Sequence, residues 1–507
     1  MLLEFYYFFR DFGQHSAARC GEILSCVIIT HCNEIVVTLQ SEISRCTMNS
    51  SKDTDRLYEL KQLPVGKLLW KYSLPAIVGI VVMSLYNIVD RIFIGQGVGP
   101  DAIAGLAITF PVMNLTSAIG MLIGVGAASR VSIVLGQNNK EMAFKILGNS
   151  IIMTLVLGAC YITFFAIFMD DILRLFGASE RTLPYAHDFM MYILPGMLMM
   201  NLCYSYNNIM RASGYPTRAM ITMIIGAGLN VILAPIFIFA LKWGIKGAAI
   251  ASDISMGVSA AFVMLHFMSA KSEIHFKKGI YRLEKTILLS IISIGAAPFL
   301  INCAGCAINA IVNNMLFKHG GDSAVASMGI FTTYTQLLVM VVIGICQGMQ
   351  PIVGYNYGAR QFNRLRRTYF LAVGASTVLC TLGSILSLSF PQYIAMAFTV
   401  DGDLIKAIVK SLSITTLVFW GVGFQVVSTN FFQSLGMAKK SIFLSLTRQI
   451  IFLIPLLFIL PPHFGLDGVW AAFPSADALA IVITAIMIFK QFRILKRMEI
   501  SPETTTI

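Results

Sequence analysis

Two stretches that lie 222 residues apart decide the fold of this chain. Residues 102–136 read AIAGLAITFPVMNLTSAIGMLIGVGAASRVSIVLG, and residues 324–358 read AVASMGIFTTYTQLLVMVVIGICQGMQPIVGYNYG. They align without a gap, and Gly136 of the first stretch coincides with Gly358 of the second. An internal repeat of this kind indicates two copies of one structural unit, as in many membrane transporters.

Other segments repeat at almost the same offset. NIMRASG at 208–214 aligns with NFFQSLG at 430–436, and GIKGAAIA at 244–251 aligns with GLDGVWAA at 465–472 after a shift of 221. A constant offset across separate segments is not expected by chance. We therefore predict two similar halves that are related by an axis along the membrane normal.

The composition places the chain in a membrane. Of its 507 residues 57% are apolar and only 12% are charged, whereas soluble domains carry about 25% charged residues. A bilayer core of about 30 Å needs about 20 apolar residues per helix. Twelve such runs are present, at 66–95, 102–134, 142–169, 183–209, 217–241, 245–269, 285–317, 324–356, 365–391, 404–433, 440–461 and 466–491.

These runs predict an all-α polytopic membrane protein with twelve transmembrane helices. Six helices in each half give two pseudo-symmetric lobes, at 64–283 and 284–492, and a cavity between them whose access can alternate. Lys and Arg concentrate in the loops of one side, which predicts that the tails at 48–63 and 493–507 are both cytoplasmic. The same placement explains the net charge of +12 through contact with anionic lipids, without a nucleic-acid partner.

The first 47 residues read differently from the rest. They have no basic segment followed by an apolar core and a small-residue cleavage site, so they do not resemble a signal peptide. A polar tail leading into a helix begins at Met48. We expect residues 1–47 to be a non-native upstream extension from a misassigned start codon.

Motifs for several kinds of chemistry are missing from the sequence. It contains no GxxxxGK[ST] and no HExxH, which are the motifs of P-loop nucleotide binding and zinc hydrolysis. Cys303 and Cys306 form a CxxC pair inside an apolar run, where packing is the simpler interpretation. We therefore expect no enzymatic activity, no cofactor and no metal other than a coupling ion, H⁺ or Na⁺.

Few charged side chains fall inside the predicted spans. A charge at mid-membrane costs about 2.5–3.5 kcal/mol on insertion scales, so each one is a functional candidate. The candidates are Asp90, Asp253 and Asp477, with the amide of Asn230 in a neighbouring span. A buried carboxylate can bind and release a proton or hold a sodium ion. The alternatives are a structural ion pair with an Arg, a hydrogen bond to a neighbouring helix and, for Asn230, a contact between helices.

Aromatic and methionine side chains form a second group of candidates. Such side chains can build an adaptable wall for varied ligands, although at helical spacing they are more often core or lipid contacts. The residues predicted to line a substrate cavity are Met83, Tyr86, Phe93, Met113, Tyr334 and Met349.

Taken together, several motifs resemble those of the multidrug and toxic compound extrusion (MATE) family of cation antiporters. The resemblance extends over about 64–492. It rests on LPAIVGIVVMSLYNIVDRIFIG (74–95), AIAGLAITFP (102–111), GVGAASRVSIVLGQNN (124–139), NIMRASGYPTRAM (208–220), GLNVILAPIFIF (228–239), GIKGAAIAS (244–252), QPIVGYNYGA (350–359) and GLDGVW (465–470).

The resemblance implies two six-helix lobes in a V and efflux of amphipathic, often cationic, compounds driven by H⁺ or Na⁺. It also implies a cation site formed by an acid on the first helix and an Asn/Asp pair on the fifth. Asp90 and Asn230 match this pattern, but Ala234 stands where the second acid is expected, and the acids of helices seven and ten have no counterpart. Asp253 lies at a similar depth on the sixth helix, so we expect it to supply the missing carboxylate. Ion binding in this lobe would then bend or shift the first helix.

Three alternatives remain at this stage. A lipid-linked oligosaccharide flippase of the same superfamily would need a more cationic cavity, and a membrane-embedded lipid enzyme would need a clustered catalytic set. A receptor or scaffold that has lost transport is suggested only by Ala234. We expect a monomer in a bacterial inner (plasma) membrane, with small molecules and lipids as its partners.

Overall fold

The computed structural model describes residues 56–270 and 272–500, and this part of the chain is helical without strands. The expected extension at 1–47 lies outside the described residues. In the first half the helices are α3 (Arg56–Gln62), α4 (Val65–Gly97), α5 (Pro100–Gly136), α6 (Lys140–Ile167), α7 (Met169–Leu175), α8 (Leu183–Ala212), α9 (Pro216–Pro235), η2 (Ile236–Ala240) and α10 (Gly244–Met268). In the second half they are α11 (Lys285–Gly358), α12 (Phe362–Ser389), α13 (Pro391–Met396), α14 (Gly402–Thr415), η3 (Phe419–Gly421), α15 (Val422–Ser434), α16 (Ala438–Leu446), η4 (Thr447–Leu453), α17 (Ile454–Ile459) and α18 (Pro461–Ile500).

The prediction of an all-α polytopic membrane protein is confirmed. Within the described ranges, nine helices are long and apolar enough to cross a membrane, or ten if the bent pair of α14 with η3 and α15 forms one span. The 74 residues of α11 contain a non-helical Gly321, with φ 63° and ψ −161°, where two helices join. The 30-residue α8 does not belong to these nine. The count of twelve spans and the cytoplasmic placement of both ends therefore stay predictions.

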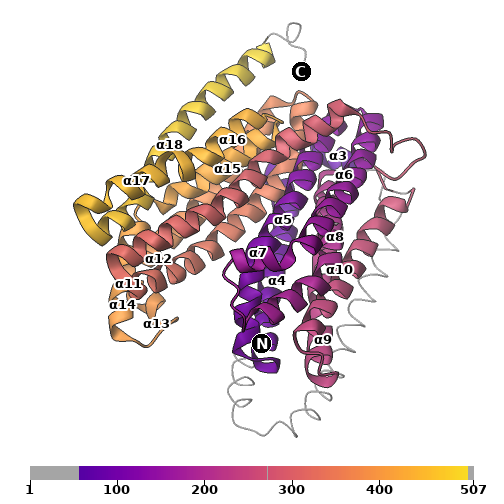
Figure 1. The fold of residues 1–507 in the computed structure, drawn as a ribbon. Helices are drawn as coiled ribbons and strands as arrows, with labels where there is room; N and C mark the ends of the chain where they lie inside the picture. The colour runs from indigo at the N-terminus through magenta and orange to yellow at the C-terminus, as the bar shows by residue number, and fades with distance from the viewer. Residues whose placement is uncertain (1–55, 271, 501–507) are drawn as a thin grey trace.

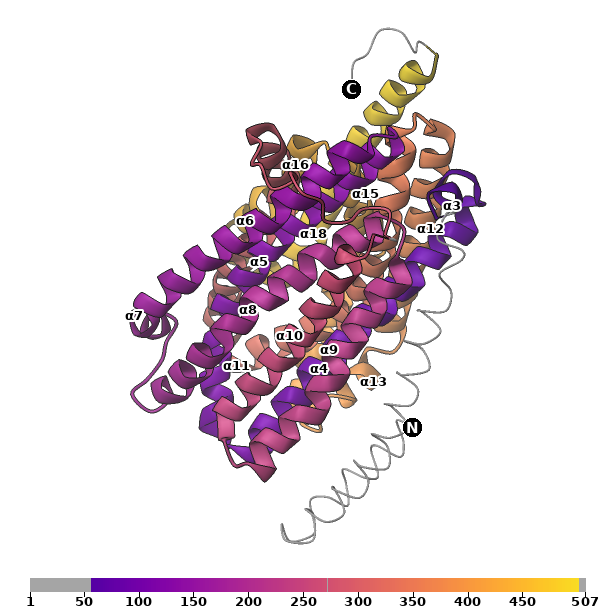
Figure 2. The same ribbon diagram turned by 90° about the vertical axis from the view of Figure 1, so that its right-hand side faces the viewer.

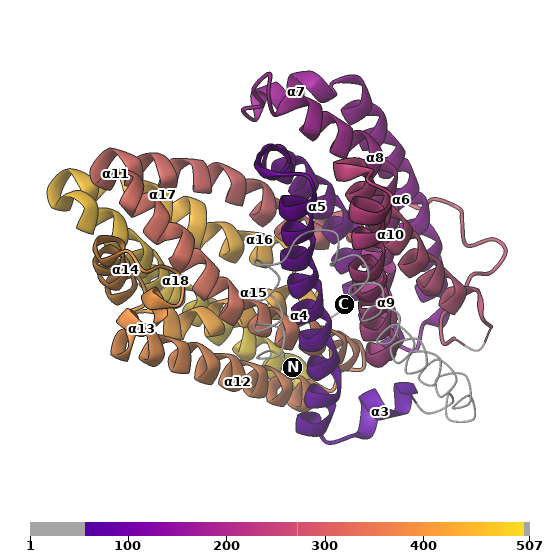
Figure 3. The same cartoon turned by 90° about the horizontal axis from the view of Figure 1, so that it is seen from below.

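The helices gather into two groups that follow the order of the chain. Figure 3 shows the indigo-to-magenta helices α4–α10 on one side and the coral-to-yellow helices α11–α18 on the other. In Figure 1 the two groups lie closest at the end where the C-terminus emerges and diverge toward the opposite end. The boundary between lobes at 283 and 284 stays a prediction, since α11 also runs along the seam between the groups.

Glycines bring the backbones of the two halves into contact. A Cβ added at Gly136 of α5 would overlap the carbonyl oxygen of Tyr355 on α11, and a Cβ at Gly358 would overlap the carbonyl oxygen of Ile133. An offset of 222 residues converts each of these contacts into the other. The helix crossing therefore has an approximate twofold axis, and only glycine permits this approach.

Additional contacts extend this seam along α4 and α11. The amide of Gln350 donates a hydrogen bond of 2.7 Å to the hydroxyl of Ser129 on α5. Gly348 and Gly344 leave room for the backbones of Ser73 and Ile77 on α4. The two halves thus meet through α4, α5 and α11.

The short helix α3 is tied to the opposite half of the protein. The Arg364 guanidinium of α12 donates hydrogen bonds of 3.2 and 2.7 Å to the carbonyl oxygens of Leu60 and Leu63, at the C-terminal end of α3. A cation stabilises carbonyls that lack helical partners. Leu60 is fully buried in the central core.

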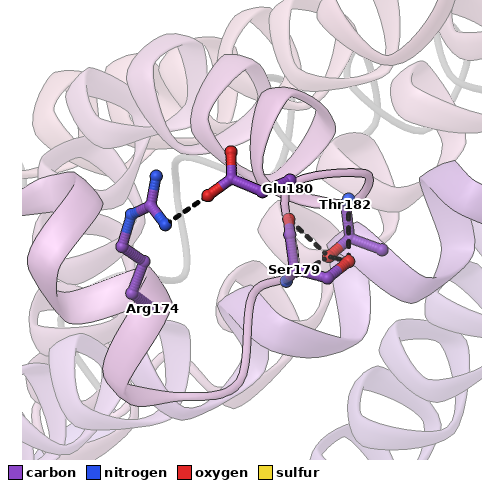
Figure 4. A network of polar contacts seen from close by, with 4 residues as sticks. All are labelled: Arg174, Ser179, Glu180 and Thr182. Carbon is purple, nitrogen blue, oxygen red and sulfur yellow. Dashed lines mark hydrogen bonds and ion pairs between the residues drawn. The ribbon is translucent and has the colours of Figure 1, made fainter.

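Ion pairs fix the loop that joins α7 to α8. Arg174 pairs with Glu180 at 2.6 Å, and the hydroxyls of Ser179 and Thr182 lie 3.1 Å apart (Figure 4). The carboxylate of Glu180 raises the pKa of the exposed Arg174 guanidinium. Arg181 extends this charged surface by pairing with Asp101 on α5 at 2.9 Å.

The two halves carry equivalent ion pairs of opposite polarity. Asp188 of α8 pairs with Lys246 of α10 at 3.2 Å, and Lys410 of α14 pairs with Asp467 of α18 at 2.6 Å. The offsets that align the two halves place Asp188 on Lys410 and Lys246 on Asp467. The structure therefore repeats the interaction while exchanging the charges.

The glycine seam gives a test of the repeat. Gly358→Ala and Gly136→Ala should each destabilise the protein by about 1–3 kcal/mol, because the added methyl group meets backbone atoms that cannot rotate away. Gly374→Ala is the control, since nothing lies within 4 Å of its Cβ position. Thermal unfolding of the purified variants measures the effect, and a Gly358→Ala midpoint equal to that of Gly374→Ala would contradict the account.

The tie between α3 and α12 can be tested separately. Arg364→Met should increase amide hydrogen exchange in α3 and leave exchange in α8 unchanged, because the acceptors that lose their donor are the carbonyls of α3 and the side-chain oxygen of Asn356 on α11. Arg367→Met, at an exposed position of the same helix, is the matched control. Equal exchange of α3 in both variants would show that the interaction does not hold this helix.

Candidate functional site

Asp90 lies in the outer half of α4, which is the half further from the seam. Its Oδ1 is buried and has no hydrogen-bond partner. The neighbouring Arg91 acts on it electrostatically, yet the Arg91 guanidinium lies 5.8 Å from the centre of the Phe110 ring. No ion pair to Asp90 is present among the described residues, so the structural interpretation as a salt bridge is not supported.

The hydroxyl of Ser252 joins α4, α9 and α10 close to Asp90. The Asn230 amide of α9 donates a hydrogen bond of 2.9 Å to Ser252 Oγ on α10. The hydroxyl of Tyr86, one turn before Asp90 on α4, interacts electrostatically with both Ser252 and Asp90. Asn230 and Ser252 are 2% and 4% exposed. The predicted residues Asp90 and Asn230 are thus connected through Tyr86 and Ser252.

The sequence did not indicate that Tyr86 and Ser252 belong to this group. Tyr86 was expected in the substrate cavity, and Ser252 was not a candidate. Serine is common in membrane helices, so its identity carries little information. The feature of the sequence that could have identified Ser252 is its position beside Asp253 in the segment ASD.

Asp253 points in another direction from its neighbour Ser252. Successive residues of a helix lie about 100° apart around its axis, and Asp253 meets α8, where a Cβ at Gly196 would overlap its Oδ1. That oxygen has no hydrogen-bond partner. Ala234, one turn after Asn230, is fully buried among apolar side chains. Among the described residues no hydrogen bond or ion pair joins Asp253 to Asn230, so the role of Asp253 in the ion site stays a prediction.

Asp477 is the third carboxylate inside the predicted spans, and it has a partner. Arg448 of η4 donates to its two oxygens at 2.5 and 3.4 Å. The carboxylate is 5% exposed and the guanidinium 32% exposed. This arrangement is the structural ion pair considered as an alternative during sequence analysis.

The predicted cavity residues fall into two groups. Met83, Tyr86 and Phe93 on α4 and Met113 on α5 are partly exposed; Phe93 packs edge-on against Phe239 of η2 with ring centres 6.3 Å apart. In the second half, Tyr334 donates a hydrogen bond of 2.6 Å to the carbonyl of Gly383, and Met349 is fully buried in the central core. A cavity role of these six residues stays a prediction.

Burial along α4 shows where the two halves separate. Its first turns are buried at the seam, including Leu68, Tyr72 and Ser73. Further along, Leu85 and Ile88 are 54% and 56% exposed. Ser84 Oγ of α4 still contacts Met340 Sδ of α11 at 3.0 Å, so the second half reaches α4 to within two turns of Asp90.

The polar groups near Asp90 are of a kind that can hold a monovalent cation. One carboxylate, one amide and two hydroxyls supply oxygen atoms for a proton or a sodium ion. Throughout 56–270 and 272–500, no group of three or more His, Cys, Asp or Glu side chains gathers as in a transition-metal site.

Comparisons with known proteins identify similar chains. The family model MatE matches residues 75–236 and 297–459. The multidrug export protein MepA of Staphylococcus aureus is 27% identical over 440 residues, which cover 86% of this chain and 96% of that protein. A solved MATE structure in the bent conformation is 25% identical with a TM-score of 0.83, covering 88% of this chain and 99% of that one. Its straight form has 25% identity and a TM-score of 0.81, with coverages of 87% and 98%.

The Arg448–Asp477 pair predicts a specific pattern of stabilities. Arg448→Met should destabilise the protein by about 3–5 kcal/mol, because it leaves a buried carboxylate without a counter-ion. The double variant Arg448→Met/Asp477→Leu should recover most of that loss. Denaturation midpoints in detergent measure both effects, and a double variant no more stable than Arg448→Met would contradict the pairing.

Proposed function

This chain belongs to the MatE family, and from that premise we propose that it exports amphipathic, often cationic, organic compounds in exchange for H⁺ or Na⁺. Its multi-pass helical structure and its similarity to a protein named for multidrug export support the export of drugs. The ion exchange is our inference from the site on α4.

The unpartnered carboxylate of Asp90 carries this proposal. An uncompensated charge in a membrane costs about 2.5–3.5 kcal/mol on insertion scales, and a bound cation removes that cost. Asn230 lies in the same polar group and would orient the site through Ser252. Asp253 is the second acid of this lobe that we assign to ion coupling.

The arrangement of α4 suggests how the ion and the drug affect each other. Asp90 and the partly exposed Met83 and Phe93 lie on the same outer half of this helix. Ion binding would alter how α4 packs against α9 and α10, and thus change the surface offered to the drug. Because such coupling is reciprocal, ion and drug must weaken each other's binding.

The seam between the halves supports transport by rocking. The halves are packed at the end that charge placement assigns to the cytoplasm, and the outer half of α4 is exposed. Breaking the contacts at Gly136 and Gly358 while closing the outer end would produce the opposite state. We place the protein in a bacterial inner (plasma) membrane, as a monomer surrounded by lipids.

Efflux from proteoliposomes tests the proposed function. Wild type loaded with ethidium should expel it under an H⁺ or a Na⁺ gradient, and Asp90→Asn should reduce the gradient-dependent rate by about tenfold or more, in line with typical coupling energies. Asp170→Asn removes an exposed carboxylate of α7 and should behave as wild type. Gradient-driven efflux that survives Asp90→Asn would refute the role of Asp90, and no efflux from wild type under either gradient would refute the proposed exchange.

A further inference from the structure

The seam between α8 and α10 contains a carboxylate that the Asp90 site does not use. The two helices pack side by side along the first half of the chain (Figure 2). Asp253 lies in this seam against the backbone of Gly196, with whose amide it interacts. Its Oδ1 is buried and makes no hydrogen bond.

The surroundings of Asp253 are suited to a proton rather than a metal cation. The facing segment of α8, residues 193–200, reads ILPGMLMM and contains no side-chain oxygen. A sodium ion, like other hard cations, requires several oxygen ligands. One carboxylate can hold a proton without any further ligand, and protonation removes the charge from apolar surroundings.

A charged pair lies on the same seam, toward the outer end of the lobe from Asp253. Lys246 precedes Asp253 by two helical turns on the same face of α10, about 10 Å away at 1.5 Å per residue. It pairs with Asp188 at 3.2 Å and lies 5.7 Å from the centre of the Tyr192 ring. Asp188, Tyr192 and Gly196 are spaced four residues apart, so they share one face of α8.

The Asp90 group contacts α10 on a different face from the one that carries Asp253. Ser252 faces Asn230 of α9 and Tyr86 of α4, whereas Asp253 faces α8. On the face of α8 that carries Gly196, the titratable groups toward the outer end are Asp188 and Tyr192, with Lys246 opposite them on α10. Tyr86 and Asp90 belong to the α4 side.

The second half offers an internal comparison. Its equivalent outer pair, Lys410 with Asp467, is present at 2.6 Å. The offset of 221 places Pro474 at the position of Asp253, so this half has the outer pair without the acid beneath it. The acid is therefore not required for the outer contact between helices.

We propose that Asp253 is a second proton-binding site, separate from the Asp90 group and reached from the outer end of the lobe along the α8–α10 seam. This proposal rests on the proposed ion-coupled function and deepens it. Two cation-binding events would accompany each transport cycle, one on each face of α10, and the event at Asp253 would be specific for H⁺.

Infrared difference spectroscopy can count the two sites without any drug. The full-length protein in lipid nanodiscs would be compared in acidic and alkaline buffers, in the band of protonated carboxyl groups. Asp90→Asn and Asp253→Asn should each remove a different part of the wild-type band and leave the other part. Asp477→Asn is the comparison variant, because it changes a carboxylate that already has a counter-ion in Arg448, and it should leave the Asp90 and Asp253 parts of the band in place.

Gly196→Ala provides a second variant that keeps every carboxylate. Its methyl group would displace Asp253 Oδ1, so only the Asp253 part of the band should shift in frequency. In proteoliposomes, Asp253→Asn should lower the number of protons exchanged per ethidium molecule by about half, as expected for the loss of one of two linked sites.

The outcomes separate the two proposals. A wild-type band unchanged by both Asp253→Asn and Gly196→Ala would overturn the second site, as would complete loss of the band in Asp90→Asn. If both bands are present but wild type expels no ethidium, the Asp253 site stands and the proposed export function fails.

Discussion

The close approach of α5 and α11 at Gly136 and Gly358 is the constraint on which the rest of the structure depends. Backbone atoms of each helix occupy the space where a side chain of the other would stand. This contact joins the two halves at one end and makes them equivalent about an approximate twofold axis. The halves diverge toward the other end (Figure 1), where Leu85 and Ile88 on the outer part of α4 are exposed.

The three carboxylates inside the spans illustrate different responses to apolar surroundings. Asp477 has a cation in place, and the Arg448 pair needs no external ion. Asp90 has hydroxyl and amide groups nearby but no cationic side chain paired to it among the described residues, which suits a site that a mobile cation can enter and leave. Asp253 has a glycine backbone beside it and an outer ion pair two turns away. Of these three carboxylates, the two without a cationic side chain paired to them, Asp90 and Asp253, lie in the first half, so we assign ion coupling to that lobe.

Much of this architecture could be predicted from sequence because it follows from composition and repetition. The aligned glycines indicated the two halves, and the rarity of charge in apolar runs identified Asp90, Asp253 and Asp477. Depth along a helix also follows from counting residues. Direction around the helix does not, because packing decides it: Ser252 meets Asn230, whereas Asp253 turns to Gly196. The contact of Arg364 with α3 was equally inaccessible, since it joins residues that are about 300 positions apart.

If the halves alternate between packing at the glycine seam and packing at the outer ends, distances between spin labels at the two ends test this rocking most directly. One pair of labels reports on the outer ends of the two halves, at Leu175 and Val400, which are 82% and 98% exposed. A second pair reports on the inner ends, at the exposed Lys278 and Lys439. The account predicts that one distance lengthens while the other shortens when the buffer changes from alkaline to acidic, and that Asp90→Asn removes the change. Distances that stay fixed, or that change in the same direction at both ends, would contradict it.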